Sequence, residues 1–141
     1  MKRPVLVLSA IAVAGGISGI LVAEGAGPEP DRAEGTAIVE VAEPDTLTDE
    51  ARAGRAAFDA VCAACHGTSG AGRFGFGPPL VHRLYEPSHH GDAAFVAAAA
   101  RGVRAHHWPF GNMPPQPQVS VGEMTAIIAY IRAMQRANGI D

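Results

Sequence analysis

The residues of this chain best suited to chemistry lie together in the sequence CAACH, at Cys62, Cys65 and His66. Two thiols at this spacing, near the end of a helix, can each form a thioether with one vinyl group of a haem. The histidine that follows is then placed beneath the iron. The chain has no other cysteines that could complete a site of four thiolates. The motif therefore predicts one covalently bound haem c, attached through Cys62 and Cys65, with His66 as an iron ligand.

Two other chemistries use closely spaced cysteines. A structural disulfide or a thioredoxin-like redox pair needs no histidine after it, and the redox pair usually lies in a βαβ unit, of which the sequence gives no sign. A zinc site could combine Cys62 and Cys65 with two histidines, but the usual second half with regularly spaced ligands is missing. Both stay open as alternatives to haem.

The second axial ligand of a haem iron has to come from elsewhere in the chain. Met113 is the leading candidate, because it lies in a proline-rich loop that can hold a thioether toward the open face of the haem. His106 and His107 are the alternatives, since imidazole binds iron well and both lie shortly before Met113. Met124 and Met134 fall on the apolar stripe of a predicted helix and are expected in the core. A methionine ligand predicts a higher reduction potential than a second histidine.

Helices separated by long loops are expected to position these residues. A helix should begin near residues 46–49, where a threonine precedes acidic residues, and run into the cysteines. Residues 67–77 contain five glycines and are predicted to form a loop. Asp92 is expected to cap a short alanine-rich helix that stops at Gly102.

The carboxyl-terminal part follows the same pattern. Four prolines between residues 103 and 119 predict an extended loop. Ser120 and Glu123 then form a capping box for an apolar-striped helix that is expected to end at Gly139. Because no segment shows strand-like alternation, the predicted fold class is all-α.

The amino-terminal segment predicts export. Lys2 and Arg3 precede an uncharged apolar run, so residues 1–23 are predicted to be a signal peptide or an uncleaved membrane anchor. The run from residue 4 to 23 is about as long as the ~20 residues that cross a bilayer, which leaves both fates open. Either would deliver the rest of the chain to the periplasm, soluble or anchored to the inner membrane.

The remaining sequence divides into two predicted parts. Residues 24–47 are acidic, contain several prolines and glycines, and are predicted to be a flexible linker. Residues 48–141 are predicted to be the haem domain. The net charge is −3, but from residue 44 onward eight arginines balance eight acidic residues and no lysine occurs. A chain without a basic stripe is not expected to bind nucleic acid.

In sequence order, several short motifs resemble those of the class I cytochrome c family over most of residues 50–139. The motifs that carry the resemblance are Gly54 with Phe58, CAACH at 62–66, GPPL at 77–80, GNMP at 111–114 and a last helix with Tyr130. The resemblance implies a small helical domain wrapped around one covalent haem. It also implies that Gly54 lets the two terminal helices cross closely, with Phe58 and Tyr130 packed at the crossing. Pro78 would accept, through its carbonyl, the Nδ1 hydrogen of the iron-bound histidine.

The expected function is single-electron transfer between redox proteins. An iron with two protein ligands has no position for a substrate, so neither an enzymatic activity nor a small-molecule substrate is expected. The alternatives are a cytochrome subunit of a larger oxidoreductase, or a haem enzyme or gas sensor with a displaceable sixth ligand. Arg73, Arg83 and Arg104 are candidates for pairing with the haem propionates.

Overall fold

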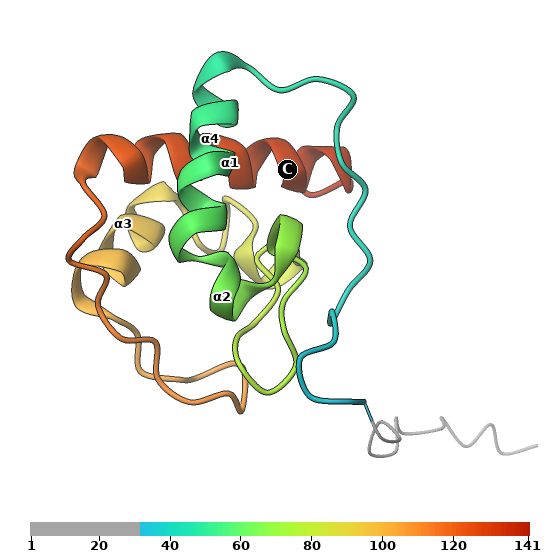
Figure 1. Ribbon diagram of the computed structural model, residues 1–141, viewed down its shortest axis with the longest axis vertical. Coiled ribbons are helices and arrows are strands. Elements are labelled where there is room, and N and C mark those ends of the chain that lie inside the picture. The colour runs from blue at the N-terminus through green and yellow to red at the C-terminus, as the bar shows by residue number, and fades with distance from the viewer. Residues whose placement is uncertain (1–31) are drawn as a thin grey trace, which may run out of the picture. The chain divides into compact units, whose positions relative to one another are not determined.

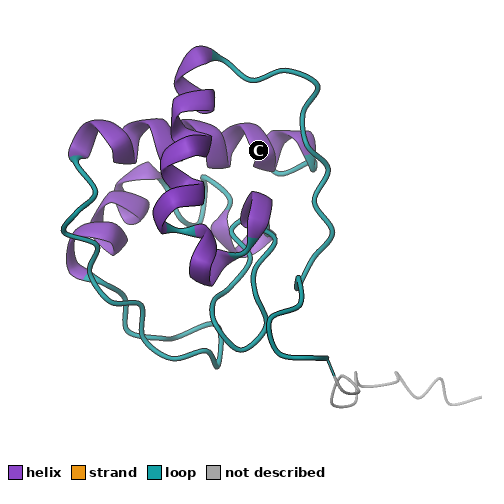
Figure 2. Ribbon diagram, in the orientation of Figure 1, coloured by secondary structure: helices purple, strands orange, loops and turns teal. Residues whose placement is uncertain are grey.

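The computed structural model describes residues 32–141, and the predicted signal or anchor of residues 1–23 lies outside this range. The helices are α1 (Asp49–Val61), α2 (Ala63–His66), η1 (Thr68–Gly70), η2 (Arg83–Tyr85), α3 (Asp92–Arg101) and α4 (Val121–Ala137) (Figures 1 and 2). Residues 32–141 contain no β-strand, only two isolated bridges between loop residues. The predicted helical class is therefore confirmed. None of the helices in this range is both long and apolar enough to cross a bilayer.

Helix α1 begins where the sequence predicted. The hydroxyl of Thr48 accepts a hydrogen bond from the amide of Ala51 at 3.1 Å, and acidic residues occupy the first turn, where the helix dipole favours negative charge. The expected continuous helix into the cysteines is interrupted at Cys62. There the amide of Cys65 bonds to the carbonyl of Cys62 three residues earlier, at 3.1 Å, which tightens the α-helical ladder and starts the short α2.

Helix α4 starts with the predicted capping box. The Ser120 hydroxyl accepts a hydrogen bond from the Glu123 amide at 3.2 Å, and the Glu123 carboxylate accepts one from the Ser120 amide at 2.8 Å. The helix ends at Ala137, two residues before the predicted end. Asn138 already departs from helical geometry, and Gly139 adopts the left-handed conformation that ends many helices.

The close crossing of α1 and α4, which the resemblance implied, is confirmed. A Cβ atom on Gly54 would lie 1.8 Å from the carbonyl oxygen of Ala126, so only glycine fits between the two backbones. Phe58 and Tyr130 are almost fully buried beside it, with ring centroids 5.5 Å apart. Figure 1 shows the two helices crossing, with α3 on one side of the crossing.

Helix α3 differs from the prediction at its start and agrees at its end. Asp92 is the first helical residue rather than the cap, and the preceding Gly91 is the N-cap. The carboxylate of Asp92 instead accepts a hydrogen bond from Nε of Arg132 on α4 at 2.9 Å. Gly102 ends the helix with a φ of 75°, as expected.

The segment before α1 is more ordered than a flexible linker. The amide of Gly35 donates to the carbonyl of Phe74 at 2.9 Å, and the amide of Ile38 donates to the carbonyl of Ala71 at 3.1 Å. Farther along, the amide of Ala42 bonds to the side-chain oxygen of Asn138 at 2.9 Å. The expectation of a free chain is therefore wrong for residues 35–42, because this stretch forms hydrogen bonds with backbone and side-chain groups of the domain.

Candidate haem site

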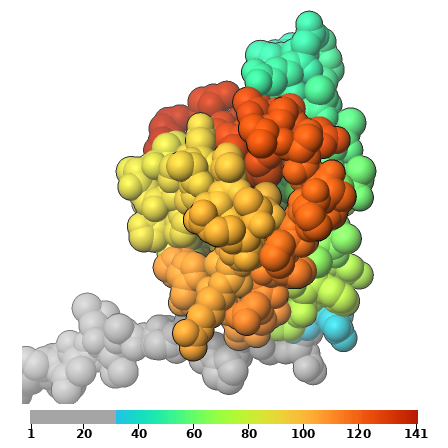
Figure 3. All heavy atoms as spheres, turned by 90° about the vertical axis from the view of Figure 1, so that its left-hand side faces the viewer, coloured from blue at the N-terminus to red at the C-terminus, as the bar shows by residue number. Residues whose placement is uncertain are grey.

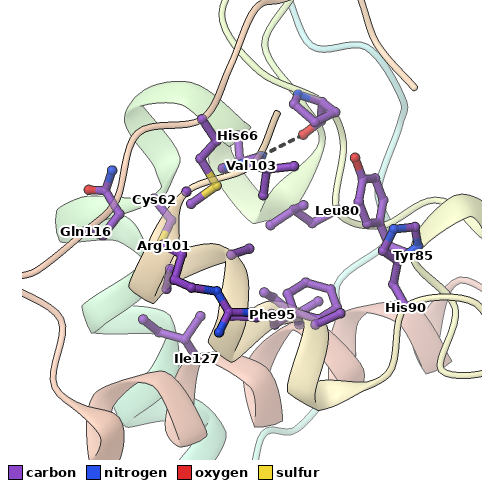
Figure 4. Close-up of a pocket in the computed structure, with 18 of the residues that line it drawn as sticks. Cys62, His66, Leu80, Tyr85, His90, Phe95, Arg101, Val103, Gln116 and Ile127 are labelled. Atoms are coloured by element: carbon purple, nitrogen blue, oxygen red, sulfur yellow. Dashed lines mark hydrogen bonds between the residues drawn. The ribbon is translucent and has the colours of Figure 1, made fainter. Parts of the chain in front are cut away.

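A cavity of about 350 Å³ lies beside the helix crossing. This volume falls in the range of about 300–1,000 Å³ that is usual for sites of small molecules and cofactors. Helix α3 supplies part of the wall with four small side chains, those of Ala94, Ala97, Ala98 and Ala99, which leave the space open. The other walls come from α4, from the end of the α1–α2 segment and from the loop after α3 (Figure 4).

His66, the last residue of α2, lines this cavity and is only 9% exposed. Its Nδ1 lies 2.9 Å from the carbonyl oxygen of Pro78 (Figure 4). A carbonyl can only accept, so Nδ1 donates and Nε2 keeps its lone pair for a metal. Burial lowers the pKa of His66, although the hydrogen bond to Pro78 partly opposes this shift, so the ring is neutral near pH 7. The hydrogen bond to Pro78 is thus present, and iron ligation by His66 stays a prediction.

Glycine is required just before Pro78. A Cβ atom on Gly77 would lie 2.6 Å from the carbonyl oxygen of Cys65. This close approach packs the backbone of the loop against that of α2 and so brings the Pro78 carbonyl to His66. The sequence GPPL therefore positions an acceptor for the histidine of CAACH.

The two cysteines differ in their surroundings. Cys62 is half-buried and lines the cavity, whereas Cys65 is exposed, and the two thiols are not joined in a disulfide. Burial, together with the neighbouring Cys65, raises the pKa of the Cys62 thiol to about 11. Catalytic redox pairs have lowered thiol pKa values, so this environment disfavours the thioredoxin-like alternative.

Met113 lines the same cavity as His66. Two backbone hydrogen bonds, of 3.0 and 2.9 Å, join Met113 to Val103 just after α3. Gly102 allows this closure, because a Cβ atom there would lie 2.5 Å from the Met113 carbonyl oxygen. The loop of residues 103–119 thus folds back onto the end of α3 and presents Met113 to the cavity.

The other candidate ligands are distributed unevenly. His106 and His107 also line the cavity, although both side chains are largely exposed, so they stay alternatives to Met113. Met124 lines it from α4 and is buried. Met134 is buried in the core of the helix crossing, as expected.

One polar residue of the cavity, Arg101, was missed from the sequence. Arg101 lines it, at helical spacing from Ala94 and Ala97 in α3 (Figure 4), and this spacing was a signal that could have been used. The indole Nε1 of Trp108 is buried without a hydrogen bond of normal geometry. It nevertheless lies near Tyr85, whose pKa is raised by burial and partly lowered by this indole.

The arginines proposed from the sequence as propionate partners do not line the cavity. Arg73 donates to the carbonyl of Ala64 at 2.8 Å and lies over the ring of Phe76. Arg83 and Arg104 are exposed, as Arg101 is, but among these arginines only Arg101 lines the cavity. Arg101 is therefore better placed than these three for a carboxylate of a bound group.

The residues around the cavity fit a haem c. They comprise a thiol at the wall with a second thiol three residues on, a buried neutral imidazole with Nε2 available and a thioether. A buried indole N–H without a partner and an arginine are available for the propionate carboxylates.

Comparison with known protein families gives one match. The family model described as Cytochrome c matches residues 51–135, which run from the first turn of α1 to near the end of α4. The matched range contains the CAACH motif, Pro78 and Met113. No curated protein and no solved structure matches the chain.

Proposed function

The chain belongs to the cytochrome c family, and from this membership we propose that it relays single electrons between redox proteins outside the cytoplasm. Proteins of this family bind haem c covalently and are generally electron carriers rather than enzymes. The observation that carries the proposal is that a buried, hydrogen-bonded His66 and the thioether residue Met113 line one cavity. Two such ligands would leave the iron no position for a substrate.

Each residue has a distinct role in this proposal. Cys62 and Cys65 would hold the haem through thioethers, and His66 and Met113 would bind its iron. When bound, the haem supplies reversible exchange of one electron between ferric and ferrous iron. The Pro78 carbonyl keeps Nδ1 of His66 protonated, which directs Nε2 to the metal.

The protein around the cofactor excludes water and stabilises its charge. The alanines of α3 and the apolar residues of α4 give the cavity a mainly apolar lining, which reduces access of water. The guanidinium of Arg101 and the unpaired indole N–H of Trp108 are the groups that we propose for the propionates.

A location outside the cytoplasm is part of the proposal. It is supported by the sequence alone, in which Lys2 and Arg3 precede an apolar run of signal or anchor length. Fractionation of cells that produce the full chain tests it. Haem-stained protein that stays in the cytoplasmic fraction would contradict the proposed location and leave haem binding untouched.

Covalent attachment is tested in a host that matures c-type cytochromes. Replacing both Cys62 and Cys65 by alanine is expected to abolish haem staining on a denaturing gel. The matched control is Ala64→Ser, a change at the exposed position between the two cysteines, which should keep the stain. A folded, colourless wild-type protein from the same host would contradict the proposal.

The carrier role is tested by ligand binding and redox cycling of the purified protein. We expect reversible reduction, a near-infrared band from methionine ligation to ferric iron, and slow or absent binding of cyanide and CO. Rapid binding without that band would favour a haem enzyme or gas sensor instead. Co-purification in a stable larger complex would favour the subunit role.

A further inference from the structure

Four of the six histidines gather at one edge of the cavity, although they come from two separate segments. His89 and His90 lie between η2 and α3, and His106 and His107 lie in the loop after α3. In Figure 3 the yellow segment before α3 and the orange loop after it meet on the same face. The nearest ring pairs have centroids 4.2 Å apart for His106 with His107 and 4.6 Å for His89 with His90.

Three of these rings are arranged as ligands to one ion would be. One ring nitrogen from each of His89, His90 and His107 lies within 4.8 Å of those from the other two. Tetrahedral zinc with Zn–N bonds of about 2.0–2.1 Å needs nitrogens about 3.4 Å apart. The side chains of His89 and His107 are exposed, so small rotations can close the remaining distance.

His90 is the fixed member of this histidine group. Its Nδ1 hydrogen-bonds to the carbonyl of Leu84, which leaves Nε2 as the free nitrogen. Its own carbonyl accepts a hydrogen bond from Nη2 of Arg132 at 2.6 Å, and its ring packs on Tyr85 with centroids 5.1 Å apart. An imidazole held by a carbonyl at one nitrogen is the usual arrangement of a metal-bound histidine.

Imidazole nitrogens are the only donor atoms of this histidine group, and neutral imidazole binds metals through one of its two nitrogens. An all-nitrogen donor set selects Zn²⁺, Cu²⁺ or Ni²⁺ over Ca²⁺ and Mg²⁺, which prefer oxygen ligands.

We propose that His89, His90 and His107 bind one divalent transition-metal ion beside the haem cavity. A bound ion would join the segment before α3 to the loop of residues 103–119. That loop carries Met113, so the ion would restrain the residue proposed as the sixth iron ligand. With Met113 as the sixth iron ligand, the site shares no residue with the haem ligands, and it does not depend on the electron-carrier role.

The test uses haem-loaded protein without a polyhistidine tag. Titration with Zn²⁺ in a calorimeter is expected to give one site per chain, and Cu²⁺ should show nitrogen coupling in its electron paramagnetic resonance spectrum. His89→Ala and His107→Ala should each weaken Zn²⁺ binding by more than the roughly 10- to 100-fold that loss of an outer-shell partner causes. Both side chains are exposed, so the folded state should tolerate either change.

The matched control is His82→Asn. His82 does not belong to the group, and its Nδ1 accepts a hydrogen bond from the Leu84 amide at 3.2 Å, a capping contact that asparagine can replace. This variant should bind Zn²⁺ as the wild type does. Zn²⁺ should also slow amide hydrogen exchange in residues 103–119 and leave the haem absorption bands unchanged.

Three results would overturn the proposal. The first is absence of stoichiometric Zn²⁺ binding, and the second is binding that survives both His89→Ala and His107→Ala. The third is a change in the iron-ligand bands on adding Zn²⁺ or in His107→Ala, which would assign His107 to the haem iron. If Zn²⁺ leaves hydrogen exchange in residues 103–119 unchanged, the inference that the ion restrains Met113 is wrong.

Discussion

Two regions of the molecule differ in how closely they are packed. The helix crossing is formed by α1 and α4, and the cavity wall is formed by α3 and the loop of residues 103–119. At the crossing, Gly54 brings two backbones into contact, and Phe58 and Tyr130 fill the space around it. At the cavity wall, alanines and a folded-back loop leave about 350 Å³ open. One region is packed by the protein's own backbone and side chains, and the other is shaped for a group that is not part of the polypeptide.

The difference teaches where the stability of this domain resides. The crossing buries large apolar side chains, which contribute roughly 1.5–3 kcal/mol each. The α3 part of the cavity wall has mostly alanines to bury, so its contacts depend on the cofactor. We therefore expect substitutions at the crossing to affect the stability of the fold and substitutions at the cavity wall to affect the chemistry of the iron.

The largest loss of stability is expected for Gly54→Val. The Cβ atom would lie 1.8 Å from a backbone oxygen of α4, which cannot move aside as a side chain can. We expect a loss of about 3 kcal/mol or more in the free energy of unfolding, the upper end of overpacking effects. Chemical denaturation of the haem-loaded protein measures it.

The control for Gly54→Val is Gly122→Ala, in the first turn of α4. A Cβ atom there meets nothing within 4 Å, so stability should be unchanged or raised by at most about 1 kcal/mol. Equal losses for the two variants would show that the crossing is not especially tight.

The next largest effect is expected for Arg132→Met, which removes the link between the two regions. Arg132 is 7% exposed and donates from α4 to the carbonyls of Tyr85 and His90 and to the carboxylate of Asp92. The carbonyl of His90 and the buried side-chain oxygen of Gln135 would lose this donor, which should lower the free energy of unfolding by about 2–3 kcal/mol. Hydrogen exchange in residues 85–92 should become faster.

Arg136→Met is the matched control, since Arg136 is exposed one turn farther along α4. We expect a change within about 0.5 kcal/mol, as for most surface substitutions. If Arg132→Met changed the free energy of unfolding as little as Arg136→Met, other contacts would hold the crossing and the cavity wall together.

Met113→Leu should change the reduction potential of the haem much more than the stability of the fold. Leucine has similar volume, so stability should fall by less than about 1.5 kcal/mol. The reduction potential should nevertheless fall, by a sizeable part of the roughly 0.8 V range that axial ligands set. Met124→Leu, on the α4 wall of the same cavity, is the control and should leave potential and spectrum unchanged. An unchanged spectrum in Met113→Leu would transfer the sixth-ligand role to His106 or His107.

The smallest effect is expected for Glu43→Gln, before α1. A hydrogen bond from the Ser69 hydroxyl at 2.7 Å, with the charge of Arg55, lowers the pKa of Glu43 below its usual 4.5. The ionised form therefore stabilises the folded state above that pH, and this contribution disappears as the pH falls through the lower folded-state pKa. Because the contact is exposed, Glu43→Gln should remove at most about 1 kcal/mol.

Denaturation of wild type and Glu43→Gln between about pH 2.5 and pH 6 measures this contribution. The two stability curves should converge toward the acidic end and separate above the usual carboxyl pKa. Curves that stay parallel over the whole range would show that Glu43 titrates alike in the folded and unfolded states.

Local signals in the sequence predicted most of the secondary structure. The threonine cap of α1, the Ser120–Glu123 capping box and the glycine that ends α3 all act within a few residues, so they could be recognised without a fold. The CAACH motif likewise contains its two thiols and its imidazole in one short segment. The resemblance of the chain to a known family predicted the Pro78 contact and the Gly54 crossing, which the residues alone would not have shown.

Contacts between distant segments were decided only in the tertiary structure. Pairing of residues 35–42 with the domain, the partner of Asp92, and Arg101 at the cavity in place of Arg73 all depend on which surfaces meet. The same is true of His89 and His107, which are separated by a helix in sequence and adjacent in space. Caps and motifs are encoded by neighbours along the chain, whereas these contacts depend on how segments far apart in the sequence pack together.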